Sequence, residues 1–111
     1  MEKLERYRQI IRDYLTAHVR PPKNEPVEIY TIFDAEQDHY LLMSVGWYKT
    51  LNRSYGILIH IDIKNEKLWI ECNNTEDEIG DELVELGVEK SDIVLAFHAP
   101  YKRQYTGFAV G

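Results

Sequence analysis

The sequence has little cysteine and no long apolar run. Its single cysteine, Cys72, excludes a disulfide within the chain and is typical of a reducing compartment. No apolar run approaches the ~18 residues needed to span a bilayer. The charged N-terminus, residues 1–6, lacks the apolar core of a secretion signal. We therefore expect a cytoplasmic protein with no membrane segment.

Motifs for nucleotide binding and covalent catalysis are also missing. The 6 glycines are scattered, so they form no phosphate-binding loop. There is no Gly-x-Ser-x-Gly motif and no Cys–His pattern that would indicate an activated nucleophile. Cys72 has no second thiol at ligand spacing. We expect no cofactor, no metal and no enzymatic activity.

The chain also has fewer bases than acids, 13 Lys and Arg against 19 Asp and Glu, which gives a net charge of -6. Free-standing proteins that bind duplex DNA normally carry a net basic surface. The charge is uneven, however. Residues 71–92 hold nine acids and one base, whereas the first 24 residues hold six bases and three acids. A solvated helix face explains the acidic stretch more simply than a docking site for a partner.

The periodicity of the 111 residues predicts one α+β domain spanning residues 1–111. Helical spacing covers residues 2–18, and the prolines of the connector at 20–26 end that helix. Alternation with period two then predicts strands at 27–34, 39–47, 54–63 and 67–72. The loops between them are short, as at 49–52, which favours a four-stranded antiparallel meander.

A second helix is predicted after the strands. Thr75 and Glu78 are spaced as a capping box, and Gly87 is placed to end the helix. The residues that we expect to face inward are Ile79, Leu83 and Leu86. Residues 93–97 form a short apolar strand or an extended segment.

Both helices are expected to pack on one face of the sheet. Ile57, Ile59, Ile61 and Ile63 share one face of their strand, and Leu41, Met43, Val45 and Trp47 share one face of theirs. The face without helices is expected to carry Tyr30, Tyr40, Ser44, His60, Asp62 and Trp69. Such an aromatic face predicts either a further protein layer or a C-terminal segment that folds back over it.

Two places are candidates for chemistry. His60 and Asp62 are two apart, so their side chains share a face and can pair as a general base or, as we favour, as a hydrogen-bonded interface pair. His39 lies near Asp34 and Asp38, which offers a metal site. Acids are common in turns for other reasons, and we favour that explanation.

The C-terminal segment interleaves aromatic and basic residues. This pattern stacks on bases and neutralises phosphates, but it also suits a protein interface, which we favour because the bases are few. We expect the interacting residues to be Trp47, His60, Asp62, Trp69, His98, Tyr101, Lys102, Arg103 and Tyr105.

Several strings in order resemble the XisI-like family along essentially the whole chain. They are residues 33–40 (FDAEQDHY), 44–47 (SVGW), 60–64 (HIDIK), 67–70 (KLWI), 82–88 (ELVELGV), 92–95 (DIVL) and 100–111 (PYKRQYTGFAVG). The chain departs from the common Gly-Phe-His-Pro-Pro string at residues 96–100 and has Gly80 where alanine is frequent.

The resemblance implies an accessory, controlling role in programmed excision of a DNA segment, the fdxN element, during heterocyst development in cyanobacteria. It implies a companion protein of the XisH type and a separate recombinase, with DNA contacted through these partners. We also expect a homodimer or a larger homo-oligomer. The alternatives are direct DNA binding by the basic N-terminal helix and the tail, and an unrecognised enzyme that uses His60 and Asp62.

Overall fold

The computed structural model describes residues 2–20, 26–49 and 51–111. The predicted connector and the loop at 49–52 fall partly on residues 21–25 and 50, outside the described residues. The elements are α1 (Lys3–Thr16), β1 (Val27–Asp34), β2 (His39–Tyr48), β3 (Asn52–Lys64), β4 (Lys67–Asn73), α2 (Ile79–Glu85), η1 (Lys90–Asp92), β5 (Ile93–Leu95) and η2 (Pro100–Tyr105). No described helix is both long and apolar enough to cross a membrane.

Helix α1 forms where apolar residues recur at helical spacing, as predicted. Glu2 caps its first turn by accepting hydrogen bonds from the amides of Leu4 and Glu5, at 3.1 and 3.3 Å. The helix ends at Thr16, two residues before the predicted end. Its buried side chains are Tyr7, Ile11, Tyr14 and Leu15.

The sheet has five strands rather than the predicted four. Strands β1 to β4 form the predicted antiparallel meander. Strand β5 adds to β4 in parallel, with Leu68 opposite Ile93, and α2 lies in the crossover that a parallel pair needs. A three-residue apolar run carries no alternation, so its pairing could not be predicted from the pattern.

A β-bulge decides which side chains of β3 face the helices. The register between β2 and β3 shifts between Leu42 and Met43, so Ile57 lies opposite Met43 while Leu58 packs against the core. The prediction that all four isoleucines share one face is therefore wrong for Ile57 and correct for the three others. In the part of β3 that precedes the bulge, the side chains therefore point to the opposite face from the one that uninterrupted alternation would give them.

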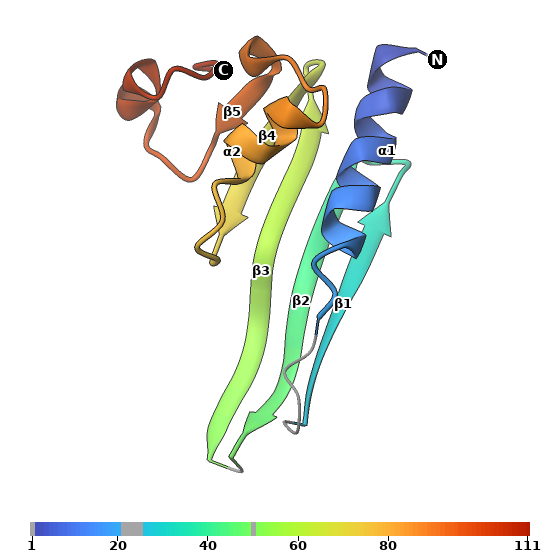
Figure 1. The fold of residues 1–111 in the computed structure, drawn as a ribbon. Coiled ribbons are helices and arrows are strands. Elements are labelled where there is room, and N and C mark those ends of the chain that lie inside the picture. Colours follow the sequence, from blue (N-terminus) through green and yellow to red (C-terminus); the bar gives the residue numbers. More distant parts are fainter. Residues whose placement is uncertain (1, 21–25, 50) are drawn as a thin grey trace.

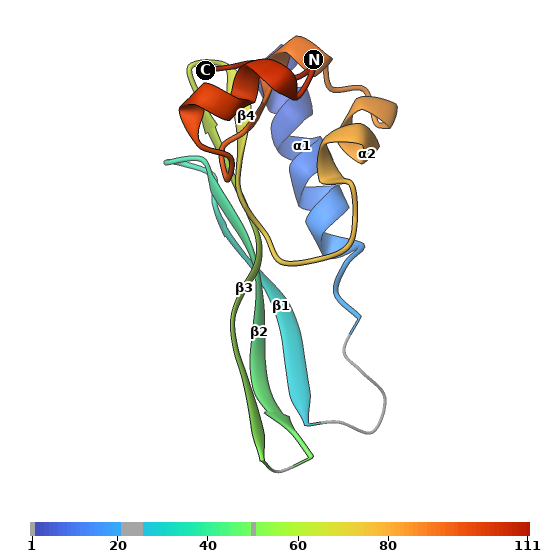
Figure 2. The ribbon, with the colours of Figure 1, turned by 90° about the vertical axis from the view of Figure 1, so that its left-hand side faces the viewer.

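Both helices cover the same face of the sheet and leave the opposite face open (Figure 2). The placement of Tyr40 and Ser44 on the open face was wrong, because the register puts them on the helix side, where they are 0% and 4% exposed. Their hydroxyls are satisfied there. Tyr40 donates to Asp38 at 2.8 Å, and Ser44 hydrogen-bonds Ser54 at 2.5 Å. The alternate residues of β2 share one face, as predicted, but that face is the open one: Leu41, Met43, Val45 and Trp47.

The predicted capping box at the start of α2 does not form. The Thr75 hydroxyl donates to Asn73 at 2.6 Å and accepts from the Asp77 amide at 3.2 Å, so it belongs to the turn before the helix. The residue that caps α2 is Glu78, whose side chain makes no capping hydrogen bond. Because Asn73 accepts hydrogen bonds from both the amide and the hydroxyl of Thr75, this threonine is not available to cap the helix.

The end of α2 agrees with the sequence only in part. Gly87 has a φ of +112°, the left-handed conformation predicted for the residue that ends the helix. Leu86 was expected to face inward but is 53% exposed, whereas Val88 is 2% exposed. The reversal at Gly87 therefore turns Val88, rather than Leu86, into the core.

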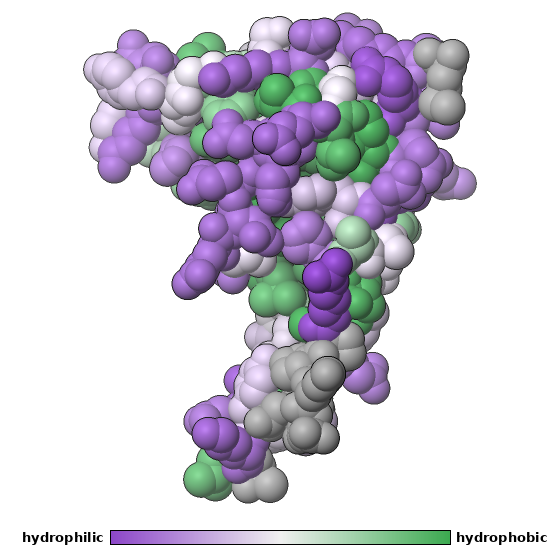
Figure 3. Space-filling model, in the orientation of Figure 1, coloured by the Kyte–Doolittle hydropathy of each residue, from purple (hydrophilic) through white to green (hydrophobic). Residues whose placement is uncertain are grey.

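The molecule is elongated. Its radius of gyration is 14.8 Å, compared with about 13 Å for a compact chain of this length. The end of β2 and the start of β3 reach beyond both helices (Figure 1). We call this part, residues 46–49 and 51–55, the hairpin arm. Figure 3 shows the helix-covered side of the molecule, where hydrophilic side chains predominate over α1 and α2.

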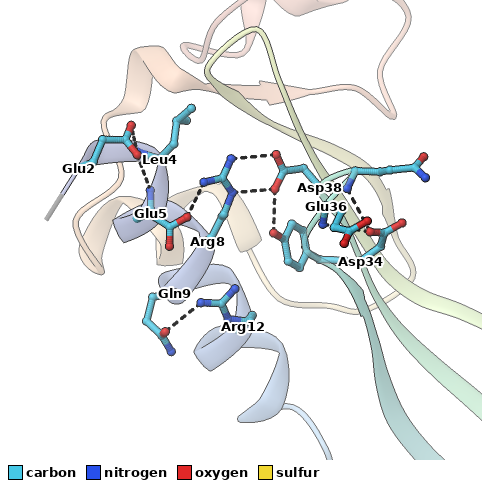
Figure 4. A network of polar contacts seen from close by, with 11 residues as sticks. Glu2, Leu4, Glu5, Arg8, Gln9, Arg12, Asp34, Glu36 and Asp38 are labelled. Carbon is cyan, nitrogen blue, oxygen red and sulfur yellow. Dashed lines mark hydrogen bonds and ion pairs between the residues drawn. The ribbon is translucent and has the colours of Figure 1, made fainter.

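A polar network fixes α1 to the turn between β1 and β2 (Figure 4). The Arg8 guanidinium donates to both carboxylate oxygens of Asp38, at 2.8 and 3.2 Å, and to Glu5 at 2.6 Å. Burial alone would raise the pKa of Asp38, but the hydrogen bonds from Arg8 and Tyr40 outweigh it and lower that pKa. The network holds the residue that directly precedes His39.

Candidate interaction surface

The open face of the sheet is the candidate site. Cross-strand pairing gathers on it the residues Tyr30, Ile32, His39, Leu41, Met43, Val45, Trp47, Arg53, Tyr55, Ile57, His60, Asp62 and Trp69. Several of its large apolar side chains are exposed: Tyr30 at 38%, Ile32 at 45%, Trp47 at 45% and Tyr55 at 69%. A monomer gains nothing by exposing such a row, which is typical of a contact surface.

A histidine–aspartate cluster occupies one end of this face. His39 on β2 lies opposite Asp62 on β3, and His60 is on the same side of β3. Asp62 Oδ1 is 2.8 Å from His39 Nδ1 and 2.7 Å from His60 Nε2. The predicted pairing of His60 with Asp62 is confirmed. Asp34 accepts hydrogen bonds from backbone amides of its own turn, as the favoured explanation predicted, and Asp38 binds Arg8 rather than joining His39 in a metal site.

The cluster is partly open to solvent. The side chains are 50% exposed for His39, 28% for His60 and 16% for Asp62. The hydrogen bond to Asp62, and the negative charge of that carboxylate, raise the pKa of His39. One carboxylate oxygen therefore orients two imidazoles, an arrangement that suits proton exchange, an interface or a cation.

The hairpin arm lies at the other end of the face. Trp47 is eight residues beyond His39 on β2, about 26 Å away along an extended strand. The Arg53 guanidinium lies 5.2 Å from the centre of the Trp47 ring and 5.3 Å from that of Tyr55. Its Nη1 also donates to the Gly46 carbonyl at 3.2 Å. Tryptophan, tyrosine and arginine are the side chains that contribute most to protein interfaces.

The C-terminal segment covers part of the open face, near β4. Arg103 donates to the carbonyls of His98 and Ala96, at 3.1 and 3.2 Å, and its guanidinium lies 5.6 Å from the centre of the Trp69 ring. Arg103 therefore holds its own segment in place. Trp69 donates through Nε1 to the Lys64 carbonyl at 3.0 Å. The predicted alternative in which the C-terminal segment folds back therefore holds at Trp69, while Trp47 stays exposed.

The tyrosines of this segment point outward. Tyr101 is 68% and Tyr105 is 80% exposed. Together with His98, Lys102 and Thr106 they line a hollow of about 430 Å³. The Lys102 ammonium lies 5.8 Å from the centre of the Tyr101 ring. Of the two bases predicted to interact here, Lys102 is exposed, whereas Arg103 is bound to the backbone of its own segment.

The bases of α1 are largely engaged within the chain. Lys3 pairs with Asp92 at 3.0 Å, and Arg6 donates to the Gly87 carbonyl at 2.8 Å. Arg8 binds Asp38, as described above, and Arg12 donates to Gln9 at 3.0 Å. The contacts of Lys3, Arg6 and Arg8 join α1 to the rest of the fold, and that of Arg12 stays within the helix. These engaged bases leave the helix poorly disposed to neutralise phosphates.

Among the polar and aromatic residues of this surface, sequence reasoning missed three. His39 was assigned to its own turn, although the register of the first two hairpins would have placed it opposite Asp62. Arg53 and Tyr55 share the parity of the buried isoleucines of β3, so alternation alone would bury them. The bulge at Ile57 and Leu58 moves both to the open face. No pattern in the sequence indicates that bulge.

These features define a small α+β protein with one sheet face covered by helices and an opposite face rich in aromatic and histidine side chains. The chain belongs to the XisI family, since the family described as "XisI protein" matches residues 1–110. A XisI-like protein from Anabaena variabilis, known from a crystal structure, is 40% identical, with a TM-score of 0.88 over 99% of this chain and 100% of that one.

A second crystal structure is also similar. It is that of fdxN element excision controlling factor XisI from Anabaena variabilis, which is 33% identical, with a TM-score of 0.83 over 99% of this chain and 100% of that one. No curated protein matches the chain. Both the predicted family and the XisI-like fold are thus confirmed.

Proposed function

We propose that the chain is an accessory factor that controls excision of a DNA element, and that it acts by contacting other proteins rather than by catalysis. The observation that carries the proposal is the family match along residues 1–110, with a relative described as an excision controlling factor. The open face supports action through protein contacts, because it offers an extended surface. The net charge of -6 also favours protein contacts over direct contact with DNA.

The proposed partners are a second copy of the chain and a companion protein of the XisH type. The apolar row of β2 and the aromatic residues of the hairpin arm supply contact area, and Arg53 between Trp47 and Tyr55 supplies a rigid polar centre. Removing the Trp47 side chain is expected to cost at least about 2 kcal/mol of binding free energy, which is roughly a 30-fold loss of affinity.

The test is light scattering of the purified chain, alone and mixed with an XisH-type protein encoded near it. We expect a defined oligomer and a stable complex, both weakened by Trp47→Ser. Leu86→Ser is the matched control, because Leu86 is also apolar and is 53% exposed but belongs to the end of α2. A chain that stays monomeric and does not bind the companion protein would contradict the proposal. Equal effects of Trp47→Ser and Leu86→Ser on assembly would contradict it too.

Direct DNA binding is the second candidate, and the hollow around Lys102 is the observation that favours it. Exposed Tyr101 and Tyr105 beside an ammonium can stack on unpaired bases. This function predicts a salt-sensitive gel shift of single-stranded DNA that is lost in Lys102→Ala with Tyr105→Ala. Absence of a shift at low salt would exclude it and leave protein contact as the function.

A further inference from the structure

The histidine–aspartate cluster has the donor atoms of a metal site. The ligand atoms of His39, His60 and Asp62 all lie within 4.8 Å of one another. They come from the adjacent strands β2 and β3, whose pairing with each other is regular from His39 to Leu42, so backbone hydrogen bonds fix the positions from which they project. Two imidazole nitrogens and one carboxylate oxygen are a ligand set that zinc, copper and nickel accept readily.

The geometry requires only a small adjustment to hold an ion. Tetrahedral zinc with ligand bonds of about 2.0–2.2 Å separates its ligand atoms by about 3.3–3.6 Å. Asp62 Oδ1 now lies 2.8 Å from His39 Nδ1 and 2.7 Å from His60 Nε2. The two oxygen–nitrogen separations must therefore lengthen by about 0.6 Å, and the two imidazole nitrogens, now within 4.8 Å of each other, must come to the same spacing. The ion replaces the two hydrogens that the imidazoles donate to Asp62, and each neutral ring then carries its proton on its other nitrogen.

A second group of possible ligands suits an ion less well. His18, Asp77 and Glu82 also lie within 4.8 Å of one another. This group supplies one imidazole instead of two, and its Glu82 already accepts a hydrogen bond from Tyr14 at 2.9 Å. The hollow that it lines includes Arg20, whose positive charge opposes a cation.

We propose that His39, His60 and Asp62 form a binding site for a divalent transition metal of the zinc type on the open face of the sheet. Three protein ligands leave a fourth position for water or for a group from another molecule. The partly exposed histidine side chains, at 50% and 28%, leave that position accessible from the open side. The site goes beyond the proposed excision function and does not depend on it.

The test is a titration of the full chain, freed of metal by a chelator, with Zn²⁺ in competition with a chromogenic chelator at neutral pH. We expect saturation at one Zn²⁺ per chain. Loss of a residue that merely orients a metal ligand costs about 10–100-fold in affinity. Removing a direct ligand, in His39→Ala, His60→Ala or Asp62→Ala, is therefore expected to cost about 100-fold or more.

His18→Ala is the matched control, because it removes a histidine from the competing group and is expected to leave the affinity unchanged. Histidine side-chain NMR gives a second readout that does not depend on any variant folding. Zn²⁺ should shift the ring resonances of His39 and His60 and leave those of His18 and His98 in place. Wild-type binding no tighter than that of the His39→Ala/His60→Ala double variant would overturn the proposal. Larger shifts at His18 would overturn it too.

Discussion

Tyr7→Phe tests how α1 is joined to the C-terminal half of the chain. The Tyr7 side chain is fully buried. Its hydroxyl donates to Asp92 Oδ2 at 2.7 Å and accepts from the Glu89 amide at 3.2 Å. Phenylalanine keeps the ring and removes only these two hydrogen bonds, so the substitution isolates their contribution to the free energy of unfolding.

The expected loss is about 2–3 kcal/mol. A hydrogen bond to a charged group contributes about 1.5–3 kcal/mol, and the partly buried Glu89 amide is left without its acceptor. Asp92 keeps its ion pair with Lys3 at 3.0 Å, which limits the loss. For a chain of this size, about 2.5 kcal/mol corresponds to a fall of roughly 10 °C in Tm.

The loss should depend on pH in a defined direction. Burial alone would raise the pKa of Asp92, but the hydrogen bonds from Tyr7 and Lys3 outweigh it and lower that pKa. A carboxyl whose pKa is lower in the folded state adds stability above its unfolded pKa of about 3.9. That stability is lost as the pH falls through the folded pKa. The gap between wild type and Tyr7→Phe should therefore be full at neutral pH and shrink below about pH 4.

The assay is urea unfolding followed by circular dichroism at several pH values. Tyr105→Phe is the matched control, because Tyr105 is 80% exposed and its substitution should change stability by less than about 0.5 kcal/mol. A gap at neutral pH below about 0.5 kcal/mol would refute the role assigned to the Tyr7 hydroxyl. A gap that stays constant down to pH 2 would refute the coupling to Asp92.

Two further predictions concern the sheet. A Cβ on Gly46, whose φ is +152°, would lie 2.2 Å from the Pro26 carbonyl oxygen, so Gly46→Ala should cost more than about 2 kcal/mol in urea unfolding. Gly56→Ala is its control, since a Cβ there meets nothing within 4 Å and should cost nothing; equal effects would contradict the clash. Asp38, whose pKa is lowered although burial opposes this, should lose its stabilising contribution as acid protonates it, and Arg8→Gln should reduce the acid sensitivity of unfolding. An unchanged acid transition in Arg8→Gln would disprove that role.

Most of the sheet could be predicted because its information is local. Alternation of apolar and polar residues from Val27 to Cys72 indicates the strands. The short turns between these strands indicate that neighbours in the chain pair antiparallel. The same local reasoning paired His60 with Asp62, since residues two apart on a strand share a face. The partner of His39 was missed because it is 23 residues away, at Asp62, and is reached only through the register of two hairpins.

The sequence by itself determined the meander, the position of α1 and the family, because periodicity and motif order are properties of neighbouring residues. Tertiary structure decided the rest. The bulge at Leu58 exchanged the faces of β3 and brought Arg53 and Tyr55 to the open side. Docking of Ile93–Leu95 on β4 created the fifth strand. Both depend on which distant backbone groups find hydrogen-bond partners, and that is settled only when the whole sheet assembles.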